Sequence, residues 1–422
     1  MTTLTLDVFR TLLANGHGRA VLYLETHDPA PFREAILHAC LNDLRYDRQT
    51  ENSRAPYLYA LIQLSGDFAG LRDCILAALA DPGEGESERQ LYDLAYEFAR
   101  RGDAGARAAL YAAFDRNSGS DEPLPADSLA LLDGPAALSF AAERLLPDED
   151  GEEDWELVSA LDGLMERDGV AETRVALETL QSPSVNRLLA FVDREAAERA
   201  ARPEGPAPRR PALPYSEMRR RILAGDRSRT YPIAMTRWGQ RANDVDLLLA
   251  ANDALAETDP VRRRAFLGVF QQRAWPIDPQ PLIALADDPD ERVARLARVA
   301  LGYVAHPSVR GWALEVACDL EMRSFAVGAL STNREPDDDA LVASWLEDPP
   351  ADRTALHCLT WSAIDYAKAH PGPGVNRVLR AVYEHVPCSQ CRGRALDELS
   401  KCGPLPESIV AEIRHDADRL AY

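Results

Sequence analysis

A single stretch, Asp287–Leu301, constrains the fold more than any other part of this chain. Its apolar residues recur at intervals of three and four, which places them on one face of an α-helix. Asp290 precedes them and is predicted to cap the helix N-terminus, where Glu291 also interacts favourably with the helix dipole. The predicted buried face consists of Val293, Leu296, Ala297, Ala300 and Leu301.

The same pattern recurs along the chain at a nearly constant interval. Val261, Val293 and Met322 occupy equivalent positions, separated by 32 and 29 residues. A weaker copy follows the pair Cys391-Arg392. A self-similar period near thirty residues is typical of a helical-repeat array, in which each unit is a helical hairpin that buries its apolar face against its neighbours.

The repeated order of Asp, Val-Arg, Ala and Ala-Leu over residues 259–332 resembles the HEAT repeat, in the short form also found in phycobilisome-lyase-like proteins. The sequence boxes typical of ankyrin and tetratricopeptide repeats are missing from this sequence. The resemblance implies an all-α fold, an α-solenoid of about ten antiparallel helical hairpins, with a concave face suited to a protein partner. It does not carry a chromophore-attaching activity across.

Helical apolar spacing extends over most of the chain and predicts about twenty helices. A proline-rich stretch at 202–214 interrupts it, because its five prolines exclude a regular helix and favour an extended connector. We therefore expect a degenerate N-terminal helical-repeat segment at 1–201, a linker at 202–214 and a C-terminal HEAT-like segment at 215–422.

Composition narrows the classes of partner and location. The formal net charge is −21, which argues against nucleic acid, because generic nucleic-acid binding requires positive charge to neutralise phosphates. No apolar run approaches the roughly 20 residues that span a bilayer, so no membrane association is expected. The seven cysteines lie mostly in apolar helical stretches, and no basic region precedes an apolar one at the N-terminus. These features predict reduced thiols, no signal peptide and a cytoplasmic location.

Positive charge nevertheless gathers between Arg199 and Arg241, where eleven arginines accompany only three acidic residues and the local net charge is +8. Arginines beside aromatic side chains can bind phosphates, stack on bases or dock acidic peptides. Pairing with acidic helices of the same chain is the alternative interpretation. The candidate residues for an anionic partner are Arg219, Arg220, Arg221, Arg237, Trp238 and Arg241.

The resemblance to HEAT proteins adds an enzymatic alternative, because HEAT-like arrays include the AlkD-like DNA glycosylases, which act on alkylated bases. Those enzymes use an aromatic-lined concave groove that contains an acidic residue. The residues that would imitate this arrangement here are Tyr231, Trp238 and either Asp244 or Asp246. No motif specific to that family is present.

The motif Cys388-Ser389-Gln390-Cys391 is the sharpest local signal for chemistry, and Ser389 is predicted to cap the helix that follows. Three interpretations remain open: packing and capping, metal binding, and a redox pair. A metal ion requires further ligands, and Cys402 would lie about 20 Å away along the helix. His385 and His415 remain as the possible additional ligands.

Signatures of catalysis are otherwise missing from the sequence: it has no nucleophile elbow, no phosphate-binding loop and no zinc-protease motif. His357 and Cys358 are neighbours in a predicted helix and project in different directions, so they do not form a catalytic dyad. We therefore predict a non-enzymatic scaffold that binds a protein partner, with no cofactor and no catalytic residues. The alternatives are an AlkD-like glycosylase and a zinc- or redox-linked regulator that uses Cys388 and Cys391. The oligomeric state is not predicted.

Overall fold

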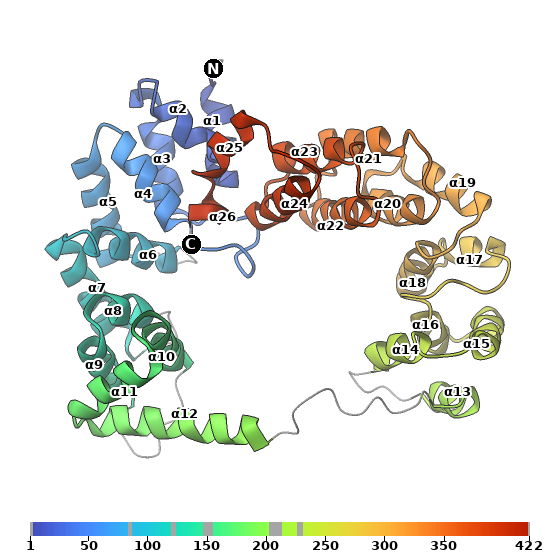
Figure 1. Cartoon of the computed structure of the whole chain (residues 1–422), viewed down its shortest axis with the longest axis horizontal. Coiled ribbons are helices and arrows are strands. Elements are labelled where there is room, and N and C mark those ends of the chain that lie inside the picture. Colours follow the sequence, from blue (N-terminus) through green and yellow to red (C-terminus); the bar gives the residue numbers. More distant parts are fainter. Residues whose placement is uncertain are drawn as a thin grey trace. The chain divides into compact units, whose positions relative to one another are not determined.

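The computed structural model describes residues 3–82, 87–119, 124–146, 155–201, 213–225 and 231–420. These residues form twenty-six α-helices and two 3-10 helices, and they contain no β-strand (Figure 1). The predicted all-α class is confirmed. The helices outnumber the prediction because several are short, such as α17 (Gln280–Leu285) and α26 (Ala417–Leu420). Among the described helices, none has the length and apolar character needed to cross a bilayer.

The chain divides into two compact units. Unit 1 comprises Met1–Gly205 together with Pro406–Tyr422, and unit 2 comprises Pro206–Leu405. The division falls within the predicted linker, of which residues 202–212 lie outside the described part of the chain. The last residues group with unit 1, whereas the sequence placed them in the C-terminal segment 215–422.

In unit 1, consecutive helices pack against each other, and most also pack against the helix two places further along the chain. The large side chains of its core, such as Phe9, Tyr57 and Phe114, are fully buried. Its helices are α1 (Leu6–Asn15), α2 (Arg19–Leu24), η1 (Ala30–Phe32), α3 (Arg33–Leu41), α4 (Ala55–Leu64), α5 (Phe68–Ala80), α6 (Glu88–Ala99), α7 (Ala104–Asn117), α8 (Ala126–Asp133), α9 (Pro135–Leu145), α10 (Trp155–Asp168), α11 (Val170–Thr179), α12 (Pro183–Ala201), α25 (Glu407–Ile413) and α26.

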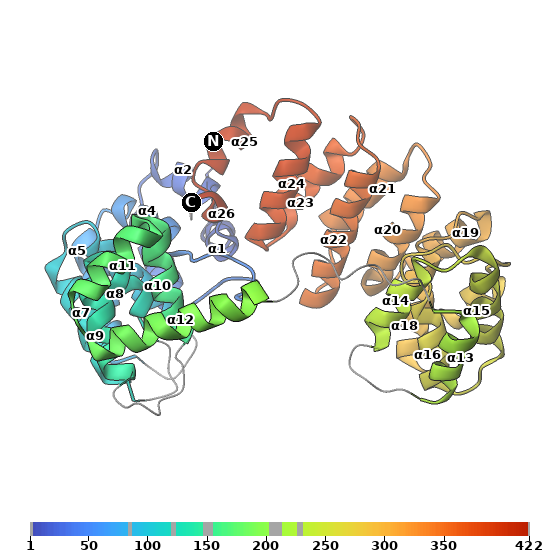
Figure 2. The same cartoon turned by 60° about the horizontal axis from the view of Figure 1, so that its bottom comes forward.

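Unit 2 has the same kind of packing, and alternate helices from α14 to α24 contact one another in succession (Figure 1, Figure 2). This row consists of α14, α16, α18, α20, α22 and α24. The helices of unit 2 are, in chain order, α13 (Tyr215–Leu223), α14 (Tyr231–Gly239), α15 (Asp244–Ala256), α16 (Pro260–Gly268), α17, α18 (Glu291–Leu301), α19 (Pro307–Val316), η2 (Leu320–Met322), α20 (Arg323–Thr332), α21 (Asp338–Glu347), α22 (Arg353–Ala369), α23 (Asn376–His385) and α24 (Ser389–Lys401).

Several helices of this row begin after an aspartate N-cap residue. Asp259, Asp290 and Asp352 are the N-cap residues of α16, α18 and α22, and each carboxylate accepts a hydrogen bond from backbone N–H groups of the first turn. Asp319 does the same for η2, which leads into α20. An aspartate cap satisfies N–H groups that the helix itself cannot pair. The caps at 259, 290 and 319 agree with the repeat inferred from the sequence, and the cap at 352 extends it by one more helix.

The helix α18 also carries the predicted apolar face. Val293, Ala297, Ala300 and Leu301 are fully buried, whereas Leu296 is only partly buried. Four of the five side chains that the apolar spacing of the sequence selected on α18 are therefore fully buried.

The C-terminal segment packs against the first two helices of unit 1. Ala417 donates its backbone N–H to the Gly16 carbonyl oxygen at 2.9 Å. The Arg19 guanidinium forms two hydrogen bonds with the Glu412 carboxylate, at 2.7 and 3.0 Å. Residues nearly four hundred positions apart in the sequence are thus joined by charge-assisted contacts within one unit.

Candidate functional site

A cavity of about 540 Å³ opens on the row of helices α18, α20 and α22 in unit 2. A volume of this size is within the range of protein binding pockets. The aromatic and basic side chains that line it are Arg295, Arg298, Tyr303, Phe325, Trp361 and Tyr366. Three successive helices of one row therefore contribute to a single surface that combines apolar and cationic groups.

A buried polar network fixes one wall of this cavity. The Tyr366 hydroxyl donates to Asp339 Oδ1 at 2.7 Å, and Arg334 binds the same carboxylate and also donates to the tyrosine hydroxyl. Burial raises the pKa of Tyr366 above its usual range, the hydrogen bond to Asp339 raises it further, and Arg334 acts in the opposite direction. Tyr366 therefore stays a neutral donor at physiological pH, and its ring is held in place.

Small residues provide the room in the cavity. Gly328, in the middle of α20, lines the cavity, and a Cβ atom built there would meet no other atom within 4 Å. Glycine in a helix interior costs about 0.5–1 kcal/mol relative to alanine. The space at Gly328 is therefore not required for the packing of the helices.

The rim of the cavity carries two arginines and one exposed carboxylate, Asp365, which lies 3.5 Å from Lys368 Nζ. Arg295 is exposed and forms no ion pair with any residue that the structure describes. Arg298 is held by the Ala286 carbonyl oxygen and by Glu291, and its guanidinium lies 5.8 Å from the centre of the Phe325 ring. One arginine at this rim is therefore available to bind an anion from solvent.

The structure places the predicted arginine cluster on α13 and α14. Arg219 donates to Asp253 Oδ2 at 2.6 Å. Arg220 and Arg221 both bind the Glu217 carboxylate on their own helix, at 2.7 and 2.9 Å. These three arginines are thus paired with acidic side chains of unit 2. Pairing within the chain was the alternative interpretation of the arginine-rich stretch in the sequence.

The remaining members of that cluster differ in exposure. Trp238 is buried, and its indole N–H donates to the Leu213 carbonyl oxygen at 2.7 Å. Arg237 and Arg241 are exposed. The Tyr231 side chain lies outside the described part of the structure. Stacking of a base on Trp238 therefore requires a rearrangement, because the ring belongs to the core of unit 2.

The two cysteines of the predicted motif lie at the start of α24, together with a histidine from α22. One ligand atom each of His357, Cys388 and Cys391 lies within 4.8 Å of the others. Both cysteines are fully buried, and the histidine is partly buried. The histidine differs from the two candidates that sequence proximity suggested: His385 is exposed, and neither it nor His415 belongs to this group.

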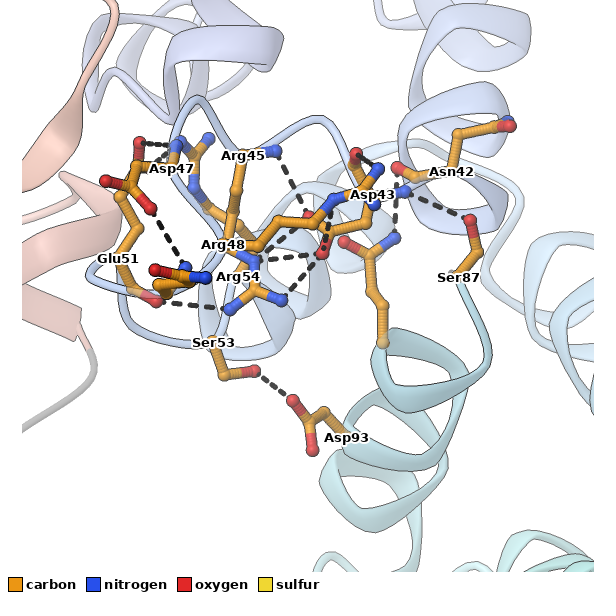
Figure 3. Close-up of polar contacts among 12 residues, drawn as sticks. Asn42, Asp43, Arg45, Asp47, Arg48, Glu51, Ser53, Arg54, Ser87 and Asp93 are labelled. Carbon is orange, nitrogen blue, oxygen red and sulfur yellow. Dashed lines mark hydrogen bonds and ion pairs between the residues drawn. The ribbon is translucent and has the colours of Figure 1, made fainter. Parts of the chain in front are cut away.

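A second polar site, in unit 1, was not anticipated from the sequence. The segment between α3 and α4 carries a network of ion pairs, in which Asp43, Glu51 and Arg54 are buried (Figure 3). Arg45 binds the buried Asp43 carboxylate through Nε and Nη2, and it also donates to the Glu51 carbonyl oxygen at 3.1 Å. Burial acts to raise the pKa of Asp43, but the hydrogen bonds and charge of Arg45 outweigh it, so the pKa of Asp43 is lowered.

This network attaches the segment to α6. The Asp43 backbone N–H donates to Ser87 Oγ at 3.3 Å, and Ser53 Oγ donates to Asp93 Oδ2 at 2.6 Å (Figure 3). Gln90 donates its side-chain amide to the carbonyl oxygens of Ala39 and Cys40, which are the unpaired groups at the end of α3. The sequence signal for this network was the high density of charged residues in the short segment RYDRQTENSR at 45–54. Such a density is more often found in an exposed loop.

The Asp93→Asn substitution is expected to raise the free energy of unfolding at neutral pH. Burial raises the pKa of Asp93, so the folded state is penalised when this carboxyl is charged, whereas asparagine keeps the acceptor for Ser53. The gain should shrink as the pH falls through the raised pKa toward the ordinary aspartate value, because the carboxyl is then protonated in both states. Urea denaturation at several pH values measures the difference. A gain that is independent of pH would contradict the assignment.

No family model matches the chain, and neither a curated protein nor a solved structure is significantly similar to it.

Proposed function

We propose that the chain is a HEAT-type helical-repeat scaffold, built as an α-solenoid, whose cavity on α18, α20 and α22 binds a segment of a partner protein. The segment is expected to be extended and to carry an acidic side chain next to an apolar one. This proposal keeps the function inferred from the sequence and adds a location and a chemistry for the partner.

The arrangement of the helices supports the repeat assignment. Four helix starts of one row use aspartate caps at 259, 290, 319 and 352, spaced by 31, 29 and 33 residues. Arg263 and Arg323 each donate to the carbonyl oxygen six residues earlier, Glu257 and Ala317 respectively. Repeated caps and repeated arginine contacts are expected when one structural unit recurs along the chain.

The observation that carries the binding proposal is the composition of the cavity. Trp361, Tyr303 and the arginines belong to the residue types that contribute most to the binding energy of protein interfaces. The unpaired charge of Arg295 favours an acidic group, and the apolar ring of Phe325 favours an apolar neighbour. The cavity is shared by three successive helices of the row, so an extended segment that crosses them can contact all three.

We expect Gly328→Phe to abolish partner binding while leaving the fold intact. A phenyl ring at this position would project into the cavity and obstruct it, and its Cβ atom would meet no other atom within 4 Å. The loss of affinity should exceed about 100-fold, or about 2.7 kcal/mol. Affinity capture from the native cell, compared quantitatively between the wild-type chain and the variant, gives the readout.

Gly311→Phe is the matched control, because Gly311 on α19 is exposed, does not line the cavity, and would likewise leave a Cβ atom with no other atom within 4 Å. The proposal requires a protein that is retained by the wild type and by Gly311→Phe and is lost from Gly328→Phe. Arg295→Glu should weaken the same interaction by charge reversal. Equal retention by all the variants, or no specific protein at all, would exclude the cavity as the binding site.

A further inference from the structure

Beyond partner binding, unit 2 contains a group of side chains with the chemistry of a metal site. His357 comes from the first turns of α22, and Cys388 and Cys391 come from the start of α24. These two helices are neighbours in the same row. One imidazole nitrogen and two sulfur atoms converge to within 4.8 Å of one another. We propose that His357, Cys388 and Cys391 form a binding site for a zinc ion.

The donor set selects the class of metal. Thiolate and imidazole ligands suit zinc, whereas magnesium and calcium require oxygen ligands. Zinc–sulfur bonds of about 2.3 Å and zinc–nitrogen bonds of about 2.0 Å place tetrahedral ligand atoms roughly 3.5–3.8 Å apart. The observed separations, all within 4.8 Å, exceed this by at most about 1.3 Å, which small side-chain rotations can supply.

The repeat itself indicates that sulfur at this position has a specific role. The other helices of this row that follow the repeat have aspartate as the cap, at 259, 290 and 352, whereas the cap of α24 is Cys388. Its sulfur accepts a hydrogen bond from the Cys391 N–H at 3.5 Å, an ordinary length for a sulfur acceptor. Cysteine is not among the preferred N-cap residues, so capping alone does not account for its presence. A metal ligand accounts for both cysteines at once.

The surroundings hold the first cysteine in position. Arg392 is buried and donates to the Pro387 carbonyl oxygen at 2.9 Å, which fixes the loop that leads into Cys388. On binding Zn²⁺, the two thiols release their protons to solvent, and the neutral imidazole donates a lone pair. Three protein ligands leave the fourth tetrahedral position for a water molecule.

Metal titration of the full chain tests this site. The purified protein is freed of metal with a chelator under reducing conditions and titrated with Co²⁺, which substitutes for zinc and gives a thiolate-to-cobalt absorption band. We expect one equivalent of cobalt with this band, and its displacement by Zn²⁺. Cys391→Ala should weaken binding more than about 100-fold, since the loss of a residue that only orients a metal ligand already costs up to about 100-fold. His357→Gln should weaken binding and change the cobalt spectrum.

Two further variants separate ligation from folding. Cys388→Ser introduces a preferred N-cap, so α24 should form at least as well as in the metal-free wild type, while metal binding is lost. Cys74→Ser and Cys318→Ser remove exposed cysteines outside the group and should leave the stoichiometry unchanged. The proposal is overturned if the wild type binds no cobalt, if Cys388→Ser combined with Cys391→Ala still binds one equivalent, or if thiol titration of the fresh protein finds these two cysteines joined as a disulfide.

Discussion

Replacement of Arg54 by methionine should lower the free energy of unfolding of unit 1 by about 3–5 kcal/mol, the usual cost of removing one partner from a buried ion pair. Arg54 and Glu51 are almost completely buried, and Arg54 Nη2 lies 2.6 Å from Glu51 Oε2. Arg54 Nη1 also donates to the carbonyl oxygens of Leu13 and Ala14 at the end of α1. The substitution therefore removes the guanidinium that lies 2.6 Å from a buried carboxylate, and it removes this donor from two helix-terminal carbonyls.

The control for this prediction is a surface pair of the same chemistry. Arg10 lies 3.5 Å from Asp7, and both side chains are largely exposed, so Arg10→Met should cost less than about 1 kcal/mol. Urea denaturation followed by circular dichroism gives the free energies, and hydrogen exchange in α4 assigns the loss to unit 1. Equal costs for the two substitutions would show that the buried pair is not required.

A double substitution separates the charge from the volume. Glu51→Leu combined with Arg54→Met replaces the pair with apolar side chains, and such replacements are often neutral or stabilising. We therefore expect the double variant to recover most of the stability that Arg54→Met loses. The recovery, measured as the coupling energy of the double-mutant cycle, is the signature of an ion pair rather than of general packing.

The parts of the fold that the sequence predicted are those with a local cause. Asp290 accepts hydrogen bonds from the N–H groups of Arg292 and Val293, two and three residues away, so every participant lies within one helical turn. The apolar face of α18 follows from helical periodicity in the same way. The prediction that Ser389 caps α24 was wrong by one residue, because Cys388 fills the position that aspartate occupies in the neighbouring helices.

The candidate sites depend on long-range contacts, and the sequence indicated them only in part. The cysteine motif is local, but His357 joins it from a helix that begins more than thirty residues earlier. The arginine-rich stretch was visible in the sequence, but the pairing of Arg219 with Asp253 depends on the packing of α13 against α15. Single-sequence periodicity carries no information on which distant residues meet, so the cavity had no signal at all.

The polar segment of unit 1, on which we made no prediction from the sequence, contains two charged side chains whose burial the residue types do not indicate. Residues 45–54 contain five charged side chains and are expected to be exposed, because charged groups are rarely buried without partners. Glu51 and Arg54 are buried because they pair with each other. Burial of Glu51 and Arg54 is therefore a property of the pair, and the residue types taken one at a time do not reveal it, while Arg48, Gln49 and Thr50 of the same segment stay exposed.

Substitution of Gly18 by alanine should destabilise unit 1 by about 3 kcal/mol, the upper end of overpacking costs. A Cβ atom at Gly18 would overlap the Glu412 backbone carbonyl oxygen and lie 2.8 Å from the Asp416 nitrogen, both in the C-terminal segment. Backbone atoms cannot rotate away as a side chain can, so the segment must move. Its hydrogen bonds with Arg19 and with Gly16 are then lost.

The expected destabilisation by Gly18→Ala is opposite in sign to the usual effect of replacing a helical glycine with alanine, which is to stabilise the helix. Gly18 has φ −59° and ψ −18°, a conformation that alanine adopts without strain, so the backbone itself does not oppose the change. Gly163→Ala in α10 is the matched control, because its Cβ atom would meet only the Leu131 side chain at 4.0 Å and should stabilise the helix by up to about 1 kcal/mol. Urea denaturation should therefore show opposite shifts for the two variants. Hydrogen exchange should show that α25 loses protection in Gly18→Ala alone. Unchanged protection of α25 would mean that the C-terminal segment does not depend on this close approach.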